Sequence, residues 1–343
     1  MALTLLPLRC VVPARWLIGL LALTAVVSEA ATQPAVVAPQ HERGVNEWLM
    51  RMQDASRLRS YVGTFVVSSS TGSMSSARIW HAGDAAQQVE RVEVLTGTPR
   101  STFRRNDQVL TFLPELRVVR AERRESLGLF PNLLKSSDSS IPEFYGVRRL
   151  GAERVAGFDA DIVQLVPRDG LRFGYRVWSE RRTGLVVKLQ TLDAEGTVLE
   201  QAAFSELQLD SPVRAEKLAQ MMQPPHGWRV ERAEVVKTTA SAEGWGLRGE
   251  VAGFKPVNCY KRPVDGASAA AAGAIQWIFS DGLASVSLFV EPYDANRHRR
   301  EGVLAAGATQ TLTRRVDDWW LTIVGEVPPQ ALKAFAQSLE RRR

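Results

Sequence analysis

The sequence predicts an α+β protein, in which a curved antiparallel sheet covered by a helix precedes a smaller α+β domain. Apolar residues spaced three to four apart indicate a helix over 45–55. From residue 61 to 209, apolar and polar residues alternate with period two, as in half-buried strands. The pattern changes near residue 210, and new strands and a last helix follow. A chain of 343 residues is long enough for two such domains.

The N-terminus has the order of a secretory signal peptide. Arg9 and Arg15 precede an apolar run from residue 16 to 27, and Ser28-Glu29-Ala30 places small residues at the expected cleavage site. The apolar run is about a dozen residues, which is short of the roughly 20 that span a bilayer. We therefore expect residues 1–30 to be removed and the mature chain to be exported.

Cysteine content and charge bound the properties of the mature chain. Cys10 lies within the signal peptide, so Cys259 remains alone and no internal disulfide is expected. The full chain has a net charge of +6 and a pI near 9.6. Outside the cytoplasm, a basic protein meets anionic lipid head groups, phosphorylated glycolipids or acidic protein segments. A soluble arginine-rich surface explains the same charge equally well.

The first predicted domain covers residues 31–210. Its helix places Trp48, Leu49 and Met52 on one face, and a strand follows at 61–67. Its clearest part is an antiparallel meander, in which strands 161–168 and 171–178 flank Asp169-Gly170, a two-residue hairpin signal. Strands at 185–190 and 198–204 complete the predicted meander.

An apolar cluster at residues 126–145 stands apart from these strands. It contains Leu127, Leu129, Phe130 and Leu133, and a Ser-rich connection follows it at 135–140. Such a segment is either a lid over a cavity or a short core helix, and the sequence leaves both open.

Residues 211–225 are predicted to link the domains, and residues 226–343 form the second domain. Ser211-Pro212 predicts the start of a short helix. Strands 274–280 and 283–291 flank Asp281-Gly282, a second hairpin signal. A strand at 319–324 and a helix that opens at Pro328-Pro329 complete an α+β domain.

Catalytic signatures are lacking in the sequence. The four histidines, His41, His81, His226 and His298, have no metal-ligand spacing and are expected at the surface or in turns. No Gly-x-Ser-x-Gly elbow or phosphate-binding glycine loop occurs. Cys259 is better explained as a core residue than as a nucleophile. We expect a binding protein with no cofactor and no metal, rather than an enzyme; a hydrolase would need a nucleophile that the sequence does not offer.

Several stretches resemble the RseB/MucB family in the same order along nearly the whole mature chain. In the first domain these are Val166-Pro167-Arg168-Asp169-Gly170-Leu171-Arg172-Phe173-Gly174-Tyr175-Arg176-Val177-Trp178 and the segment from Thr183-Gly184-Leu185 to Gln201. In the second they are Pro225-His226-Gly227-Trp228, Phe279-Ser280-Asp281-Gly282-Leu283 and the segment from Thr322 to Pro329. The loops 68–76 and 263–273 do not match.

The resemblance implies a specific fold and function. The first domain would be a half-open antiparallel β-barrel covered by helices, as in lipoprotein carriers. Family members are periplasmic regulators of the envelope-stress response that bind the periplasmic segment of a transmembrane anti-sigma factor. They shield it from a protease and release it on sensing lipid or lipopolysaccharide, and they self-associate. A periplasmic lipid or lipoprotein carrier is the alternative, although it has no need of residues 226–343.

Two sets of residues are candidates for these interactions, although core packing explains any single one of them equally well. The candidates for lining a lipid cavity are Tyr61, Phe65, Phe112, Leu129, Phe130, Phe173 and Tyr175. The candidates for binding the anti-sigma segment are Trp277, Phe279, Trp319, Trp320, Arg314 and Arg315, the aromatic ones being expected at the surface of the second domain.

Overall fold

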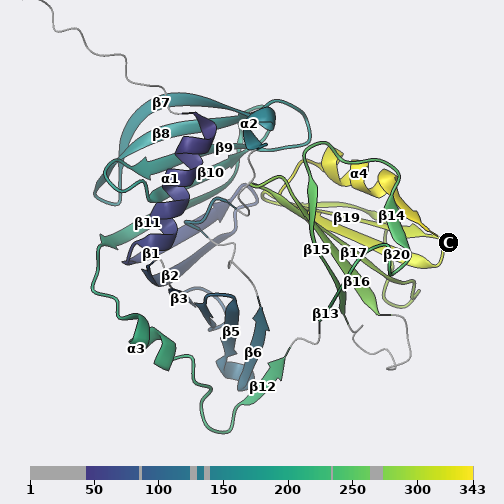
Figure 1. Ribbon diagram of the computed structural model, residues 1–343, viewed down its shortest axis with the longest axis horizontal. Coiled ribbons are helices and arrows are strands. Elements are labelled where there is room, and N and C mark those ends of the chain that lie inside the picture. The colour runs from purple at the N-terminus through teal and green to yellow at the C-terminus, as the bar shows by residue number, and fades with distance from the viewer. Residues whose placement is uncertain are drawn as a thin grey trace, which may run out of the picture. The chain divides into compact units, whose positions relative to one another are not determined.

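The computed structural model describes residues 44–84, 87–123, 130–134, 140–232, 235–262 and 273–342 (Figure 1). Over these residues the protein is mostly β-structure with some helices. The predicted signal peptide and the candidate residue Leu129 lie outside the described residues. Within the described part, no helix is both long enough and apolar enough to cross a membrane.

In the described part of the chain, the first sheet has twelve strands in the order β12-β6-β5-β4-β3-β2-β1-β11-β10-β9-β8-β7. The strands are β1 (Tyr61–Ser69), β2 (Met74–Gly83), β3 (Gln88–Val94), β4 (Ser101–Arg105), β5 (Gln108–Leu113), β6 (Val118–Arg123), β7 (Tyr145–Val155), β8 (Phe158–Pro167), β9 (Gly174–Glu180), β10 (Val186–Leu192), β11 (Val198–Leu209) and β12 (Arg229–Arg232). A short 3-10 turn at Pro114–Leu116 joins β5 to β6.

This sheet is open, so the expected barrel is half-open at most. The edge strands β12 and β7 each have one neighbour in the sheet. Strand pairs are antiparallel except at one edge, where β12 runs parallel to β6. Strand β12 comes from the segment after residue 225, so part of the expected second domain adds to the first sheet.

The predicted first helix is confirmed as α1 (Val45–Leu58). It buries Trp48, Leu49 and Met52, which belong to one apolar core with Tyr61 and Phe65 of β1. Figure 1 shows α1 lying across the strands of this sheet. Burial alternates along the first five residues of β1, because successive side chains of a strand point to opposite faces and one face lies against the helix. The helix therefore covers the inner face of the sheet.

The predicted two-residue hairpin turn at Asp169-Gly170 is wrong. Strand β8 ends at Pro167 and β9 begins only at Gly174, so residues 168–173 form a longer loop. The second predicted turn is also longer, because Ser280 pairs with Ser285 and leaves residues 281–284 between β16 and β17. In both loops the Asp side chain accepts a hydrogen bond from the backbone N–H two residues later. Such Asx turns extend the loop beyond two residues.

The second sheet has seven strands in the order β13-β15-β16-β17-β20-β19-β18. The strands are β13 (Val236–Thr238), β15 (Lys255–Arg262), β16 (Ala274–Ser280), β17 (Ser285–Pro292), β18 (Gly302–Ala306), β19 (Thr309–Val316) and β20 (Trp319–Gly325). The predicted last helix is confirmed as α4 (Pro329–Ser338), which buries Leu332 and Phe335 in the core of this sheet. Beside it, β14 (Trp245–Leu247) pairs with β21 (Leu339–Arg341).

The segment between the sheets contains a short helix, α3 (Ala215–Gln220). The expected helix start at Ser211-Pro212 is wrong, because Arg214 precedes the first helical residue. After α3, Met222 is buried in a small apolar cluster with Phe112, and Trp228 packs against that cluster. This segment is thus attached to the first sheet by apolar contacts.

Candidate functional site

The two loops with the Asp-Gly motifs meet in the structure. Arg172, in the loop between β8 and β9, donates from Nε to Asp281 Oδ2 at 2.8 Å. Asp281 lies in the turn between β16 and β17 of the second sheet. Both side chains have 0% of their surface exposed. A fully buried ion pair thus joins a loop of the first sheet to a turn of the second.

The carboxylate of Asp281 has partners on both of its oxygens. Oδ1 accepts from the backbone N–H groups of Leu283 at 2.9 Å and Ala284 at 2.7 Å. Oδ2 accepts from Arg172 and from the hydroxyl of Tyr145 at 3.2 Å. A buried carboxylate is tolerated when it is paired and hydrogen-bonded in this way. Asp281 therefore shapes its own turn and also binds the first sheet.

Arg172 is held by polar and aromatic partners. Its Nη1 donates to Asp169 at 2.6 Å, and its Nη2 donates to the backbone carbonyl of Ala252 at 2.6 Å. The guanidinium lies 4.2 Å from the ring centre of Phe144 and 4.7 Å from that of Phe254, within cation–π range. The partners come from both sheets and from the short helix α2 (Ile141–Phe144).

A glycine makes room for the arginine. Gly253 has a φ of +77°, and a Cβ there would lie 2.6 Å from the Phe144 ring and collide with the guanidinium. Only glycine fits this conformation and this space. The loop over 250–254 is therefore shaped around Arg172.

Apolar contacts accompany this ion pair. Leu283, in the turn of the second sheet, is 1% exposed and belongs to the core of the first sheet. Conversely, Leu171 of the first sheet packs against the core of the second. We call Arg172, Asp281, Tyr145 and Leu283 together the sheet–sheet contact. Arg172 and Asp281 lie in sequence stretches that resemble the family, but neither was predicted as a site residue. Loop motifs alone do not indicate which loops meet.

Two buried tyrosines connect this contact to the core of the first sheet. The rings of Tyr145 and Tyr175 lie 6.2 Å apart, and both residues belong to that core. Burial is the largest cause that raises the pKa of Tyr145 well above its ordinary value, and the nearby Tyr175 and Asp281 raise it further. Burial likewise raises the pKa of Tyr175. Both phenols therefore stay neutral, and Tyr145 remains a hydrogen-bond donor.

Four of the lipid-cavity candidates lie in one buried core. Tyr61, Phe65, Phe130 and Tyr175 belong to it together with the inner face of α1. The ring centres of Phe65 and Phe130 lie 5.5 Å apart, and Phe204 lies 4.9 Å from Phe130. We call Tyr61, Phe65, Phe130, Tyr145, Tyr175 and Phe204 together the aromatic core. In this structure its side chains fill the space between α1 and the sheet.

The other lipid-cavity candidates lie elsewhere. Phe112 belongs to a separate cluster, where its ring lies 6.2 Å from that of Trp228. Phe173 is buried in the loop between β8 and β9. The period-two pattern does not distinguish these positions, because it marks buried faces and not which cluster a residue joins. Within 126–145, Phe130, Leu133 and Ile141 are core residues.

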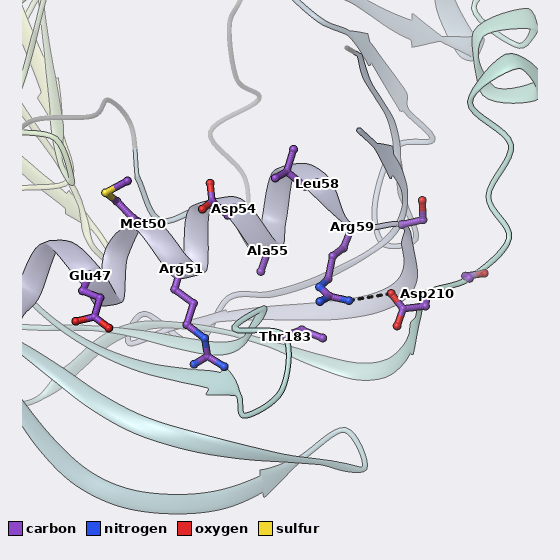
Figure 2. A pocket seen from close by; sticks show the side chains of 11 residues that line it. Glu47, Met50, Arg51, Asp54, Ala55, Leu58, Arg59, Thr183 and Asp210 are labelled. Carbon is purple, nitrogen blue, oxygen red and sulfur yellow. Dashed lines mark hydrogen bonds and ion pairs between the residues drawn. The ribbon is translucent and has the colours of Figure 1, made fainter. Parts of the chain in front are cut away.

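A groove of about 860 Å³ lies beside α1, and its lining also includes Thr183 and Asp210 (Figure 2). It is bordered by Met50, Asp54 and Leu58 of the helix, and at one end Arg59 forms an ion pair with Asp210 at 3.1 Å. Figure 2 shows Met50, Asp54 and Leu58 projecting from the same side of α1. None of the lipid-cavity candidates among the described residues lines this groove. Its lining mixes charged and apolar groups, unlike the aromatic core.

The expected exposure of the second-domain aromatics is wrong for two of them. Phe279 is 2% exposed in the core under α4, and Trp320 is 6% exposed and stacked on His298. Trp277 and Trp319 are half-buried and pack against the same core. Phe279 helps to fill the layer between the sheet and α4, whereas Trp320 points to the opposite face of β20, where His298 and Tyr293 cover it.

The two arginine candidates lie next to each other on β19. Arg315 is exposed and places its guanidinium 4.0 Å from the ring centre of Tyr293. Arg314 is half-buried and borders a second groove beside α4. Of the six candidates for binding the anti-sigma segment, Arg314 thus lines the groove beside α4.

The potential nucleophiles and metal ligands are structural in character. Burial raises the pKa of Cys259 to about 11, so its thiol is protonated at neutral pH. His81 is buried in β2, contrary to the surface or turn position expected for it, and its Nδ1 contacts the carbonyl of Arg59 at 2.7 Å. His298 is also buried, but it lies at the end of the turn that starts at Asp294, as expected. Burial lowers the pKa of His81, so it stays neutral. Among the described residues, no cluster of three metal-ligating side chains occurs.

Comparison with known proteins assigns the chain to a family. The profile of the MucB/RseB N-terminal domain matches residues 44–222, and that of the MucB/RseB C-terminal domain matches residues 239–340. The sigma factor AlgU regulatory protein MucB of Pseudomonas aeruginosa is 29% identical over 336 residues, covering 93% of this chain and 96% of that protein. The sigma-E factor regulatory protein RseB of Salmonella typhimurium is 27% identical over 297 residues, covering 86% and 90%.

Solved structures agree with these sequence matches. The complex structure of Pseudomonas aeruginosa MucA/MucB aligns with a TM-score of 0.66 at 25% identity, covering 87% of this chain and 99% of that one. A crystal structure of MucB in complex with MucA(peri) aligns with a TM-score of 0.63 at 26% identity, covering 86% and 98%. The relatives are named as regulatory proteins and not as enzymes. Together these matches span both sheets, and the chain belongs to the MucB/RseB family of sigma-factor regulatory proteins.

Proposed function

We propose that this protein binds the periplasmic segment of a transmembrane anti-sigma factor, shields it from proteolysis, and releases it on binding lipid or lipopolysaccharide. Its family membership and the solved complexes of MucB with MucA support a protein partner of this kind. The signal-peptide pattern at residues 1–30 supports export to the compartment in which such a segment lies.

One observation carries the lipid part of the proposal: the aromatic core is continuous with the sheet–sheet contact. Tyr175 lies in the core, its ring is next to that of Tyr145, and the Tyr145 hydroxyl donates to Asp281. Leu283 of the second sheet packs directly into that core. An acyl chain that enters between α1 and the sheet would therefore displace groups that hold the sheets together.

The energies are sufficient for such a switch. Burial of an acyl chain contributes roughly 0.8 kcal/mol per methylene. About eight methylenes would therefore supply the roughly 5.5 kcal/mol that reverses a two-state equilibrium. The lipid must prefer the state that cannot hold the anti-sigma segment, and the two ligands then weaken each other's binding by the same factor.

The direct test is calorimetry of the mature protein with the periplasmic segment of the anti-sigma factor from the same organism, with and without lipopolysaccharide. We expect binding that lipopolysaccharide weakens, and lipid uptake that the segment weakens to the same degree. Independent, additive binding of the two ligands would contradict the competition.

A variant tests the proposed route from the core to the contact. Tyr145→Phe keeps the ring in the aromatic core and removes the hydroxyl that donates to Asp281. We expect it to bind lipid as before but to show a smaller effect of lipid on segment binding. Tyr260→Phe, on β15 of the second sheet, is the matched control and should behave like the unmodified protein.

The lipid or lipoprotein carrier remains the alternative function. It predicts lipid uptake without affinity for the anti-sigma segment. That result in the calorimetric experiment would make the carrier the leading interpretation.

We further propose that the chain is exported, that cleavage leaves Ala31 as its first residue, and that the mature protein self-associates. N-terminal sequencing of the periplasmic protein should begin at Ala31, and light scattering should give a mass above that of one chain.

A further inference from the structure

The edge of the second sheet ends in an exposed strand. Among the described strands, β18 is the last in the order of this sheet and pairs only with β19. All five of its residues are exposed, including Leu304 at 70% and Val303 at 46%. The unpaired backbone N–H and C=O groups of an open edge strand offer a template to an added strand, and exposed apolar side chains favour such pairing.

The register shows which backbone groups of β18 are available. Ala306 pairs with Thr309 across a two-residue turn, so this closing pair exchanges both of its backbone hydrogen bonds. Hydrogen-bonded and non-hydrogen-bonded pairs alternate along an antiparallel ladder. The pairs of Val303 with Leu312 and of Ala305 with Gln310 are therefore non-hydrogen-bonded. The N–H and C=O groups of Val303 and Ala305 consequently point away from β19, toward the open edge.

A groove of about 410 Å³ borders this edge on the side of α4. Val303 and Leu312, which face each other across the ladder, form its strand side. Ala336 of α4 forms part of the opposite wall. A strand added to β18 would place every second side chain on this face of the sheet, over the groove.

The charged groups around the groove are mainly basic. Arg314 and Lys333 line it, and Arg299 and Arg300 are exposed just before β18. Among the described residues, neither Arg314 nor Lys333 has an ion-pair partner. The one acidic residue in the lining is Glu301, which accepts a hydrogen bond from the backbone N–H of Arg315 at 3.1 Å. The charge balance favours an acidic occupant.

We propose that β18 is a docking site for an extended peptide segment of a partner protein, rich in alternating acidic and apolar residues, which adds a strand to the second sheet. Backbone hydrogen bonds to Val303 and Ala305 hold the segment, and an apolar side chain enters the groove. Its carboxylates meet Arg314 and Lys333. The proposal rests on the proposed function in one respect, since the partner it names is the anti-sigma segment.

Residue-resolved hydrogen exchange of the mature protein, with and without the periplasmic anti-sigma segment, tests the docking site. In the free protein the amides of Val303 and Ala305 should exchange quickly, whereas that of Leu304 is held by the ladder. With saturating segment, exchange at Val303 and Ala305 should slow by about tenfold or more, as expected for amides that gain hydrogen bonds. Binding of the segment without this change would overturn the docking site and leave the proposed function intact.

Absence of any binding would instead contradict the proposed function, so the two failures are distinguishable. Slow exchange at Val303 and Ala305 in the free protein, increasing with protein concentration, would mean that a second copy occupies the edge. That outcome would also overturn the proposal.

A backbone variant tests the same site by affinity. Val303→Pro removes an outward N–H without removing a ladder bond, because proline is tolerated on edge strands. We expect it to weaken binding of the segment by up to about tenfold. Val236→Pro, at the start of the exposed strand β13 on the opposite edge, is the matched control. Equal affinities of the two variants, both with unchanged melting temperatures, would contradict the proposal.

A charge variant tests the expected chemistry of the segment. The double substitution Arg314→Glu and Lys333→Glu reverses the rim of the groove and should weaken binding most at low salt, where charge attraction is least screened. An unchanged affinity across salt concentrations would contradict an acidic occupant.

Discussion

At the scale of single residues, Arg172 is the side chain with the most partners at the sheet–sheet contact. It contacts two carboxylates, one backbone carbonyl and two phenyl rings, and it has no exposed side-chain surface. The planar guanidinium group of Arg172 suits this environment, because it donates in several directions and stacks on rings at the same time. Its removal leaves Asp281 buried without its charged partner.

We therefore predict that Arg172→Met lowers the free energy of unfolding by about 3–5 kcal/mol, the usual cost of leaving a buried charge unpaired. The control is Arg181→Met, which removes an exposed ion pair with Asp161 and should cost at most about 1 kcal/mol. Urea denaturation of both variants measures the difference. Similar losses for the two variants would mean that leaving Asp281 without Arg172 costs no more than breaking an exposed ion pair.

Cys259 permits a second prediction at this scale. Its pKa of about 11 lies above the value near 8.5 of a free thiol. The native protein should therefore react with iodoacetamide at pH 8 far more slowly than the unfolded chain. The stability that comes from keeping the thiol protonated is fully present below pH of about 8.5 and is lost as the pH rises toward 11. Rapid labelling of the native protein would revive the idea of a reactive cysteine.

At the scale of elements, the packing of β1 against β11 leaves no space at Gly63. A Cβ there would lie 2.6 Å from the ring of Phe204 and 2.8 Å from the carbonyl of Glu206. Phe204 belongs to the aromatic core, so the glycine allows the ring to lie across the strand. Strand β1, which contributes to the aromatic core, therefore needs a residue without a side chain at position 63.

Gly63→Ala should accordingly destabilise the protein by about 1–3 kcal/mol through overpacking. Gly146, on β7, is the matched strand glycine, since a Cβ there would have its nearest neighbour at 3.8 Å. Gly146→Ala should change the melting temperature little. If both substitutions had the same effect, the close approach of Phe204 would not be the cause.

At the scale of the whole molecule, the described residues between 44 and 342 form one compact unit, and the sheet–sheet contact shows how the two cores join. Leu283 belongs by sequence to the second sheet and by packing to the core of the first. Its removal affects the first core directly and the second through the turn that carries it. The two sheets should therefore unfold together as long as this contact is intact.

We predict that Leu283→Ala costs about 2–5 kcal/mol, as for other buried leucines. Combined with Arg172→Met, it should split the single calorimetric transition into two. Leu116→Ala, at a leucine that is 65% exposed, is the control and should leave one transition at nearly the same temperature. A single transition in the double variant would mean that other contacts couple the sheets.

The sequence predicts the local elements of this protein well. The first helix, most strands around it and the last helix follow from periodicity, because burial of one face imposes period 3.6 on helices and period 2 on strands. The Asp-Gly motifs correctly mark the chain reversals at residues 169 and 281. They do not give the turn lengths, because each loop also holds one side of the Arg172–Asp281 ion pair, and that pair joins residues 109 positions apart.

The candidate site was predicted less completely. Periodicity marks Tyr61, Phe65 and Tyr175 as buried but does not separate them from Phe112, which packs in another cluster. Arg172 falls within the strand predicted at 171–178, yet it is a buried loop residue. The edge strand β18 was not predicted at all, since its exposed residues show no burial pattern.

The sequence by itself thus predicted an export signal, and it determined the helix and strand periods and the family resemblance. Each of these depends on residues close together in the chain or on motifs in a fixed order. Only the tertiary structure decided that the two Asp-Gly loops meet, that Leu283 enters the core of the first sheet, and that β18 is an open edge. These features depend on contacts between residues about 100 or more positions apart or on the order of strands in a sheet, and local propensity carries no information about either.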